Sequence, residues 1–553
     1  MAANSFKEPG EFFKNLSRGA VATRAVMADL RALAHDIAPL ERGSDSTTVW
    51  TGVKRKALRV PDLVCLHCGQ RFESKGKSKP QVSMSHGTRD ERVWDYGLED
   101  DDIIAYPVAK EIVTRTNIGT LDQSGKAAWT EHVVREWDQY PVIPYVKVSG
   151  LRQRLDAATG SQRKDPTRGA EVYITWPMWA IERDGEVMEI AKAEDKKTSV
   201  EYHRVTVKYT DDTTKRISLK TTKNKVVVTG ECFVTVGQSL RRGEFVGGVV
   251  EPLKRDELRC QQSGADAAIE RWLATGTPVN QYSAIKLARL TQDRRYETSI
   301  RQLFGDPDVD FYVRLEASAY LIDVLNEEVP GSFQWALNGG GREKAGDAAQ
   351  VRLEAILTLS ECGNGKRGDD VVEVLQSVLV EELAALNGNG PPAWAADKDS
   401  REEHHETLAK AAVWALGHIG VTSRIDTTET LISVEVGLHR EVRSARIEAL
   451  VDLCRADAAK ERHLVSALFR AEPNVRSTAC AALLRSRLSD DAAQVLREAT
   501  KNGEVTLEAI QVLALSTEFE ERSLADTVSA EHLEAITALR ALAANESLGL
   551  GIR

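Results

Sequence analysis

The stretch that decides the N-terminal fold is Pro61–Lys75, with the sequence PDLVCLHCGQRFESK. Gly69 suits a tight turn, and the apolar runs on either side of it predict two short strands joined by that turn. Side chains alternate along a strand, so Glu73 and Lys75 share one face, which Asp62 on the neighbouring strand can join. Two carboxylates and a lysine on one face can hold a hard divalent cation and order a water molecule beside it. We therefore expect the catalytic residues in this stretch.

The bulk composition predicts a soluble protein with several domains. The chain has 553 residues, of which 42% are hydrophobic, and a net charge of −10. Because this charge is negative, contact with nucleic acid requires a local basic patch. Seven scattered cysteines argue against a disulfide framework and indicate a reducing compartment. The sequence shows neither a secretory leader nor an apolar run of membrane-spanning length, so we expect a cytoplasmic protein.

The residues around the opening stretch predict an α/β domain over residues 1–115. Helical spacing of apolar residues predicts a helix over 11–38, which Pro39 ends, with Glu41 at that end. Strands are expected at 49–51, 59–66, 71–77 and 103–109. The predicted order is helix, strand, strand, strand, followed after a loop by a further strand.

The middle of the chain, residues 116–258, predicts a β-rich domain. Strand-like runs recur between polar loops, at 142–146, 172–176, 202–209, 226–228 and 233–236. We expect this domain to help hold the substrate.

The last part of the chain, residues 259–553, predicts an all-α domain with internal repeats. The sequence VRLEA at 313–317 recurs at 351–355, 38 residues later, and related helices begin at 408, 442, 475 and 505. This pattern resembles HEAT repeats. The resemblance implies a curved solenoid of paired helices, because each repeat buries its apolar face only against its neighbours. Such a solenoid would bind a protein partner, the nucleic acid or both.

The motif in the opening stretch resembles that of the PD-(D/E)xK nucleases. Pro61 precedes Asp62, ten residues separate Asp62 from Glu73, and one residue separates Glu73 from Lys75. The resemblance implies a restriction-endonuclease-like core in which Asp62 and Glu73 bind Mg²⁺ or Mn²⁺ and Lys75 orients the attacking water. Glu41 would be the acidic residue that some members carry at the end of the first helix. The alternative is a surface hairpin with solvated charges.

Basic residues crowd the same region and predict contacts with DNA phosphates. Such contacts would be dependent on salt and largely independent of sequence. The alternative is a solvated charged surface. The residues concerned are Lys54, Arg55, Lys56, Arg59, Arg71, Lys77 and Lys79.

The turn at Cys65-x-x-Cys68 resembles half of a zinc knuckle. A structural zinc site needs four ligands, the nearest histidines are His67 and His86, and the chain has no second such pair. The alternative is a tight turn with two free thiols. The remaining cysteines, Cys232, Cys260, Cys362, Cys454 and Cys480, are expected to be buried small apolar residues.

Together these features predict a multidomain α+β protein that acts as a metal-dependent DNA nuclease. The joining of a nuclease to a large scaffold suggests prokaryotic defence against foreign DNA, by analogy of architecture only. The resemblance also implies that two active sites are needed to cut a duplex, which a homodimer would supply. The alternative function is a non-enzymatic HEAT-repeat scaffold with a degenerate nuclease-like or zinc-stabilised N-terminal domain.

Overall fold

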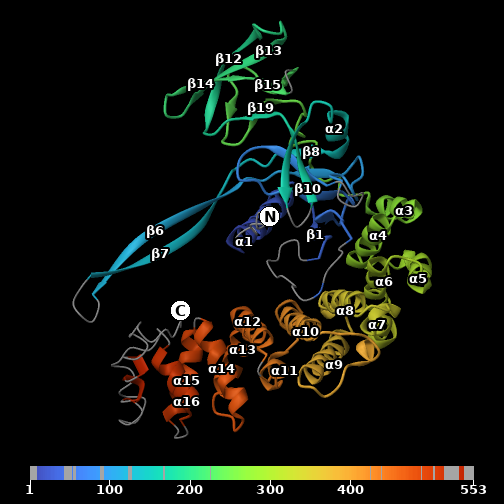
Figure 1. The fold of residues 1–553 in the computed structure, drawn as a ribbon, viewed down its shortest axis with the longest axis vertical. Coiled ribbons are helices and arrows are strands. Elements are labelled where there is room, and N and C mark those ends of the chain that lie inside the picture. Colours follow the sequence, from blue (N-terminus) through green and yellow to red (C-terminus); the bar gives the residue numbers. More distant parts are fainter. Residues whose placement is uncertain are drawn as a thin grey trace, which may run out of the picture. The chain divides into compact units, whose positions relative to one another are not determined.

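The computed structural model shows a multidomain α+β protein, with a β-rich N-terminal part followed by a largely helical part (Figure 1). Two compact units are formed, one by Met1–Val49 with Leu58–Thr291 and the other by Trp50–Ala57 with Gln292–Arg553. The expected change from strands to helices near residue 259 is confirmed, since the last strand ends at Gly248 and the next helix begins at Ala265. The structure describes residues 9–42, 53, 58–87, 93–121, 127–165, 169–223, 226–423, 425–437, 439–486, 488–501, 505–515, 533, 535–537 and 539–540.

The first helix, α1 (Pro9–Ala32), ends earlier than the sequence pattern predicts. Ala34 has a φ of 66°. The N–H of Ala34 donates to the carbonyl of Arg31 at 3.0 Å, and the N–H of His35 donates to that of Leu30 at 3.1 Å. These two bonds around a left-handed residue form a helix stop that turns the chain back. Glu41 therefore follows strand β1 (Ile37–Pro39) and does not lie at the helix end.

A five-stranded mixed sheet contains the predicted hairpin. Strand β2 runs antiparallel to β1 and β3, β3 runs parallel to β5, and β5 runs antiparallel to β8. The predicted turn is confirmed: Gly69 has a φ of 70°, and a Cβ there would lie 2.5 Å from that of Ala268, so only glycine fits. The strand expected at 49–51 lies outside the described residues. The sheet order is β1, β2 (Leu63–Cys65), β3 (Arg71–Ser74), β5 (Ile103–Ala105) and β8 (Tyr145–Lys147).

One face of this sheet packs against α1. Apolar side chains of Val26, Leu30 and Leu33 form one core with residues of β2, β3 and β5. Their burial stabilises the region by roughly 25 cal/mol per Å² of apolar surface removed from water. The hairpin is thus fixed against a helix and is not a free surface ribbon.

The other strands form several smaller sheets and confirm the β-rich content predicted for 116–258. The expected boundary at residues 115 and 116 falls inside β6, and Figure 1 shows the β6–β7 hairpin extending well beyond the other strands of its unit. A short helix, α2 (Val148–Gln153), follows β8. The strands are β4 (Val82–His86), β6 (Ala109–Leu121), β7 (Ala127–Gln139), β9 (Thr159–Asp165), β10 (Gly169–Trp176), β11 (Met178–Ala180), β12 (Gly185–Glu194), β13 (Glu201–Tyr209), β14 (Thr214–Ser218), β15 (Lys220–Lys223), β16 (Val226–Thr229), β17 (Glu231–Cys232), β18 (Ser239–Leu240) and β19 (Phe245–Gly248).

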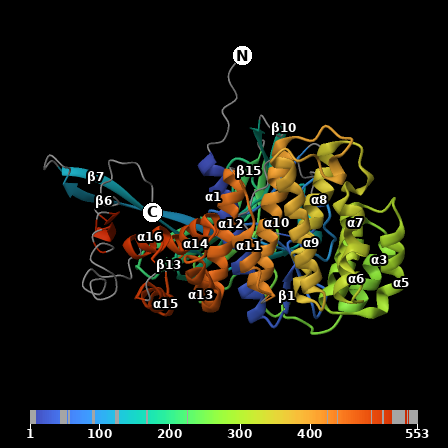
Figure 2. The same cartoon turned by 90° about the horizontal axis from the view of Figure 1, so that it is seen from below.

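Two helices, α3 (Ala265–Thr275) and α4 (Pro278–Leu290), belong to the first unit, and the helices from α5 onward to the second. The helices that contain the recurring sequence are α6, α8, α10, α12, α14 and α16, and each of them packs on the next. Figures 1 and 2 show the helices of this unit side by side in chain order. They are α5 (Glu297–Gly305), α6 (Phe311–Asp323), α7 (Val329–Leu337), α8 (Ala345–Leu359), α9 (Gly368–Leu386), α10 (Glu402–Thr422), α11 (Thr428–Ser433), α12 (Arg440–Ala456), α13 (Ala458–Ala467), α14 (Pro473–Arg485), α15 (Asp490–Lys501) and α16 (Leu507–Leu515).

Within the described part of the chain, none of the helices combines the length and the apolar character that crossing a membrane requires.

Candidate functional site

The two predicted carboxylates face each other across the β2–β3 hairpin. Leu63 pairs with Phe72 in the antiparallel register, so Asp62, one residue before β2, lies opposite Glu73 in β3. Both residues are buried, with 9% of Asp62 and 8% of Glu73 exposed. The N–H of Ser74 donates to Oδ2 of Asp62 at 2.6 Å, and Lys75 forms an ion pair with Glu73. The structure therefore brings Asp62, Glu73 and Lys75 together.

The charges in this group act on one another. Burial raises the pKa of Asp62 well above its usual value, and the charges of Glu73 and Glu41 raise it further, while Lys75 opposes them. Burial by itself would lower the pKa of Lys75. The negative charges of Glu73 and Asp62 have the larger effect, so the pKa of Lys75 is raised above its usual value. Lys75 is thus an ammonium at neutral pH. Carboxylate oxygens are ligands that hard divalent cations prefer, and two carboxylate residues lie opposite each other here.

Two residues that the sequence motif does not include also belong to this site. Tyr106 lies beside Lys75 on the parallel strand pair, because Ser74 pairs with Ala105. The Tyr106 side chain is fully buried, its hydroxyl has no hydrogen-bond partner among the described residues, and burial together with Glu73 raises its pKa. Lys77 donates to Ser83 Oγ at 3.0 Å, and burial and the charge of Lys75 lower its pKa to about 7. Alternation along the strand expected at 71–77 could have indicated Lys77, whereas no sequence signal indicates Tyr106.

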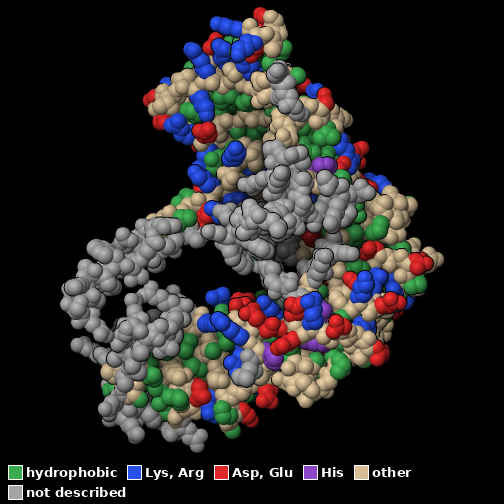
Figure 3. Space-filling view, in the orientation of Figure 1, with side chains coloured by type: hydrophobic (Ala, Val, Ile, Leu, Met, Phe, Trp, Pro, Cys, Tyr) green, Lys and Arg blue, Asp and Glu red, His purple; other side chains and the backbone are tan. Residues whose placement is uncertain are grey.

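Four of the seven basic residues predicted to contact DNA lie in the part of the chain that the structure describes, and these four do not form one exposed surface. Arg71 is fully buried and donates two hydrogen bonds to Asp102, at 2.8 and 2.7 Å, so it is not available to a phosphate. Lys77 is directed to Ser83, as described above. Lys79 is exposed, and Arg59 lies close enough to Lys75 to oppose its charge. Figure 3 shows basic side chains intermixed with acidic ones on the visible face. The other three, Lys54, Arg55 and Lys56, lie outside the described residues.

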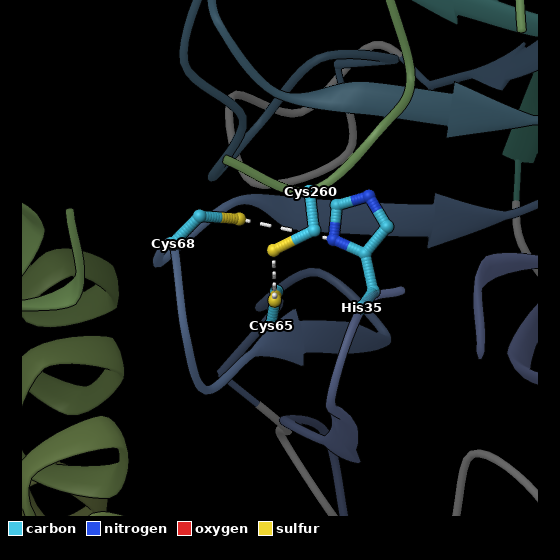
Figure 4. Close-up of side chains that lie close together, drawn as sticks. All are labelled: His35, Cys65, Cys68 and Cys260. Atoms are coloured by element: carbon cyan, nitrogen blue, oxygen red, sulfur yellow. Dashed lines mark hydrogen bonds between the residues drawn. The ribbon is translucent and has the colours of Figure 1, made fainter. Parts of the chain in front are cut away.

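A second cluster surrounds the Cys65-x-x-Cys68 turn, where His35 and Cys260 join the two cysteines (Figure 4). Their four ligand atoms all lie within 4.8 Å of one another, and these residues could hold a metal ion. Cys260, which was expected to be a buried small apolar residue, is only partly buried, and its sulfur lies in this cluster. His35 lies 30 residues before Cys65 and Cys260 lies 192 residues after Cys68, so no spacing motif could have indicated them.

The histidines that the sequence suggested as further ligands lie elsewhere. His67 is 3.9 Å from a carboxylate oxygen of Asp36, and Nδ1 of His86 accepts a hydrogen bond from the N–H of Trp94. Neither belongs to the cluster. The tip of the turn therefore supplies two thiols, and the remaining two donors come from distant segments.

The two thiols of the turn shift each other's pKa in opposite directions. The pKa of Cys65 is lowered far below its usual value, first because the Cys68 thiol donates to it, and also because backbone N–H groups of the turn donate to its sulfur. The pKa of Cys68 is raised by the same hydrogen bond to Cys65. A lowered thiol pKa favours the thiolate, which is the form that binds a metal.

Neither a scan against protein-family models nor a search of curated proteins found a match to this chain. The function is therefore inferred from these two groups of residues.

Proposed function

We propose that the protein is a metal-dependent nuclease that hydrolyses phosphodiester bonds of DNA. The observation that carries this proposal is the pairing of Asp62 with Glu73 across the buried hairpin, beside Lys75. The order of α1, β1, β2 and β3 before a parallel strand also agrees with the core that the PD-(D/E)xK resemblance requires. Isolated charges on a surface hairpin would be solvated, whereas these carboxylates are buried.

The cofactor proposed for this site is Mg²⁺ or Mn²⁺. The carboxylates of Asp62 and Glu73 would hold it, with Glu41 nearby, and when bound it supplies charge neutralisation and activation of a water molecule. The thiols of Cys65 and Cys68 do not suit such a hard ion, and zinc is the cofactor proposed for them.

Lys75 has a separate role in the proposed reaction. Because its pKa is raised, its ammonium group stays protonated at neutral pH. It can therefore donate hydrogen bonds to the attacking water and to a phosphate oxygen, and it stabilises negative charge that develops on the phosphate. We expect Arg59, whose charge acts on Lys75, to contact the neighbouring phosphate.

For the helical part we propose a HEAT-like solenoid that binds a protein partner or the substrate. The support is the packing of every recurring helix on the next, from α6 through α8, α10, α12 and α14 to α16. One continuous apolar core runs through these helices, as expected when repeats bury their faces against neighbours.

A second function is favoured by one observation. Arg71 is buried in an ion pair with Asp102, and the amine of Lys77 donates to the Ser83 side chain. Two of the basic residues predicted to contact DNA are thus engaged within the protein. This favours the alternative of a non-enzymatic HEAT-repeat scaffold with a degenerate nuclease-like or zinc-stabilised N-terminal domain.

The test is cleavage of plasmid, linear and single-stranded DNA, and of RNA, by the full chain with Mg²⁺ or Mn²⁺. We expect wild type to cut DNA and Asp62→Asn and Lys75→Ala to lose at least about a hundredfold in rate. Matched controls are Asp101→Asn and Lys147→Ala, two exposed residues of the same unit, which should cut like wild type. Equal cleavage by wild type and both site variants would come from a contaminant and would overturn the proposal.

A further inference from the structure

Four groups that can bind zinc converge from three separate segments of the first unit (Figure 4). His35 follows the stop of α1, Cys65 and Cys68 flank the hairpin turn, and Cys260 lies before α3. We propose that these four residues bind one structural Zn²⁺, and that this zinc clamps the hairpin that carries Asp62 and Glu73. The second half of this statement, on the catalytic carboxylates, rests on the proposed function; the zinc site itself does not.

The distances match a tetrahedral site. Zinc–sulfur bonds of about 2.3 Å give edges of about 3.8 Å between the ligands of a regular tetrahedron. Sγ of Cys65 lies 3.7 Å from Sγ of Cys260, and Sγ of Cys68 lies 3.8 Å from Nδ1 of His35. The widest separation in the set is within 4.8 Å. Side-chain shifts of about 1 Å or less would bring all four atoms to bonding distance of one ion.

The surroundings orient the ligands as a zinc site requires. Nε2 of His35 lies 2.7 Å from the carbonyl oxygen of Leu258. Because a carbonyl oxygen only accepts, Nε2 carries the proton, which leaves the lone pair of Nδ1 free to bind a metal; this second hydrogen bond is typical of zinc-binding histidines. The N–H of Gln262 donates to the sulfur of Cys260 at 3.3 Å, as to a metal-bound thiolate. The ring of Phe72 packs edge-on against His35 at 5.2 Å.

The composition of the site indicates a structural role for the zinc. Three thiols and one imidazole complete a tetrahedron and leave no position for water, whereas catalytic zinc keeps an open position. His35 and Cys65 are also buried, with 6% and 0% of their surface exposed. A disulfide between Cys65 and Cys260 would need only two of the four groups and would not account for the approach of His35 and Cys68.

The backbone around the site joins the three segments at the hairpin. The N–H of Cys260 donates to the carbonyl of Leu33 at 3.2 Å, and the N–H of Ala265 donates to that of His67 at 3.2 Å. Cys65 is the last residue of β2, three positions after Asp62. A zinc ion here would hold the turn closed and so maintain the register in which Asp62 lies opposite Glu73; a slip of one residue would turn one of them to the other face.

The first experiment measures zinc in the purified full chain under reducing conditions. We expect one zinc per chain after dialysis, and cobalt in its place should give the thiolate charge-transfer and intense d–d bands of a tetrahedral site. Cys260→Ser and His35→Ala should lower the zinc content to less than half, while Cys232→Ser, outside the cluster, keeps it. His35→Cys should retain the metal with a stronger thiolate band. Wild type without zinc, or full zinc content in Cys260→Ser and His35→Ala, would overturn the site.

The second experiment tests the clamp by hydrogen exchange of the backbone amides in residues 61–75. Zinc removal should raise their exchange rates by at least about tenfold, with little change in α12, and zinc addition should reverse this. Unchanged exchange would overturn the clamp. Neither readout requires nuclease activity. Bound zinc in a protein that cuts no DNA would therefore refute the proposed function alone, and cleavage by a protein without zinc would refute this inference alone.

Discussion

The N–H of Ser74 donates to Oδ2 of Asp62 at 2.6 Å, across the two strands of the hairpin. This bond orients the Asp62 carboxylate toward β3, where Glu73 and Lys75 lie. A single donor does not offset burial and the repulsion from Glu73, since the pKa of Asp62 remains raised. The hairpin thus holds a carboxylate whose ionised form is unfavourable without a cation.

Asp62→Asn should stabilise the protein in magnesium-free buffer. The raised pKa means that Asp62 ionises at lower pH in the unfolded chain, so wild type loses stability as pH rises above about 4. Asparagine still accepts from Ser74 but carries no charge. We expect its free energy of unfolding to exceed that of wild type by about 1 kcal/mol or more near neutral pH, with the gap closing toward pH 4. Thermal unfolding across this pH range measures the gap.

The control for this prediction is Asp101→Asn, because Asp101 is exposed. That variant should stay within about 0.5 kcal/mol of wild type. A gap for Asp62→Asn that widens on acidification would contradict the electrostatic explanation.

Tyr106→Phe should lower activity without lowering stability. The hydroxyl is buried without a hydrogen-bond partner among the described residues, so its removal breaks no hydrogen bond. The free energy of unfolding should stay the same or increase by up to about 1 kcal/mol. We expect the hydroxyl to hydrogen-bond to bound substrate or to metal-bound water, so its removal should slow cleavage by about tenfold. Calorimetry and cleavage rates separate the two effects.

The matched variant for Tyr106→Phe is Tyr145→Phe. The Tyr145 hydroxyl donates to Oδ2 of Asp29 at 2.8 Å, so this variant should destabilise by about 1 kcal/mol. A loss of stability in Tyr106→Phe as large as in Tyr145→Phe would mean that the Tyr106 hydroxyl has a structural partner.

Arg71→Ala should be strongly destabilising, because it would leave the buried Asp102 without its partner. Arg71 also donates to Oδ1 of Asn280 at 2.9 Å and lies 4.9 Å from the ring of Trp272. Loss of one member of a buried pair costs about 3–5 kcal/mol. Arg152→Ala removes a partly exposed pair with Asp95 and should cost about 1 kcal/mol or less. Similar melting temperatures for the two variants would refute the structural role assigned to Arg71.

Gly417→Ala should destabilise the helical unit although alanine favours helices. A Cβ on Gly417, in α10, would lie 2.6 Å from that of Ala449 in α12, and the helices must separate to accept it. We expect a cost of about 1–3 kcal/mol. Gly19→Ala, inside α1 with nothing within 4 Å of the new Cβ, should instead stabilise by about 0.5–1 kcal/mol. Calorimetry of each unit's transition gives both values, and a gain in Gly417→Ala would show that α10 and α12 pack less closely.

Local patterns were enough to predict the hairpin, the strands of the first half of the chain and the helices of the second half. Alternation around Gly69 predicted that Asp62, Glu73 and Lys75 meet, because neighbouring strands joined by a tight turn leave little choice of register. Repeated sequence predicted that equivalent helices stack. The early stop of α1 escaped prediction because Ala34, and not a glycine, takes the left-handed conformation.

The sequence by itself determined a hairpin that carries two carboxylates and a lysine, followed by a row of repeated helices, since turn chemistry and periodicity are local properties. Only the tertiary structure decided which basic side chains are exposed and which possible metal ligands come together. It buries Arg71 against Asp102, and it brings His35 and Cys260 to Cys65 and Cys68 from far along the chain. Burial and long-range convergence depend on how segments pack, and no spacing between residues encodes them.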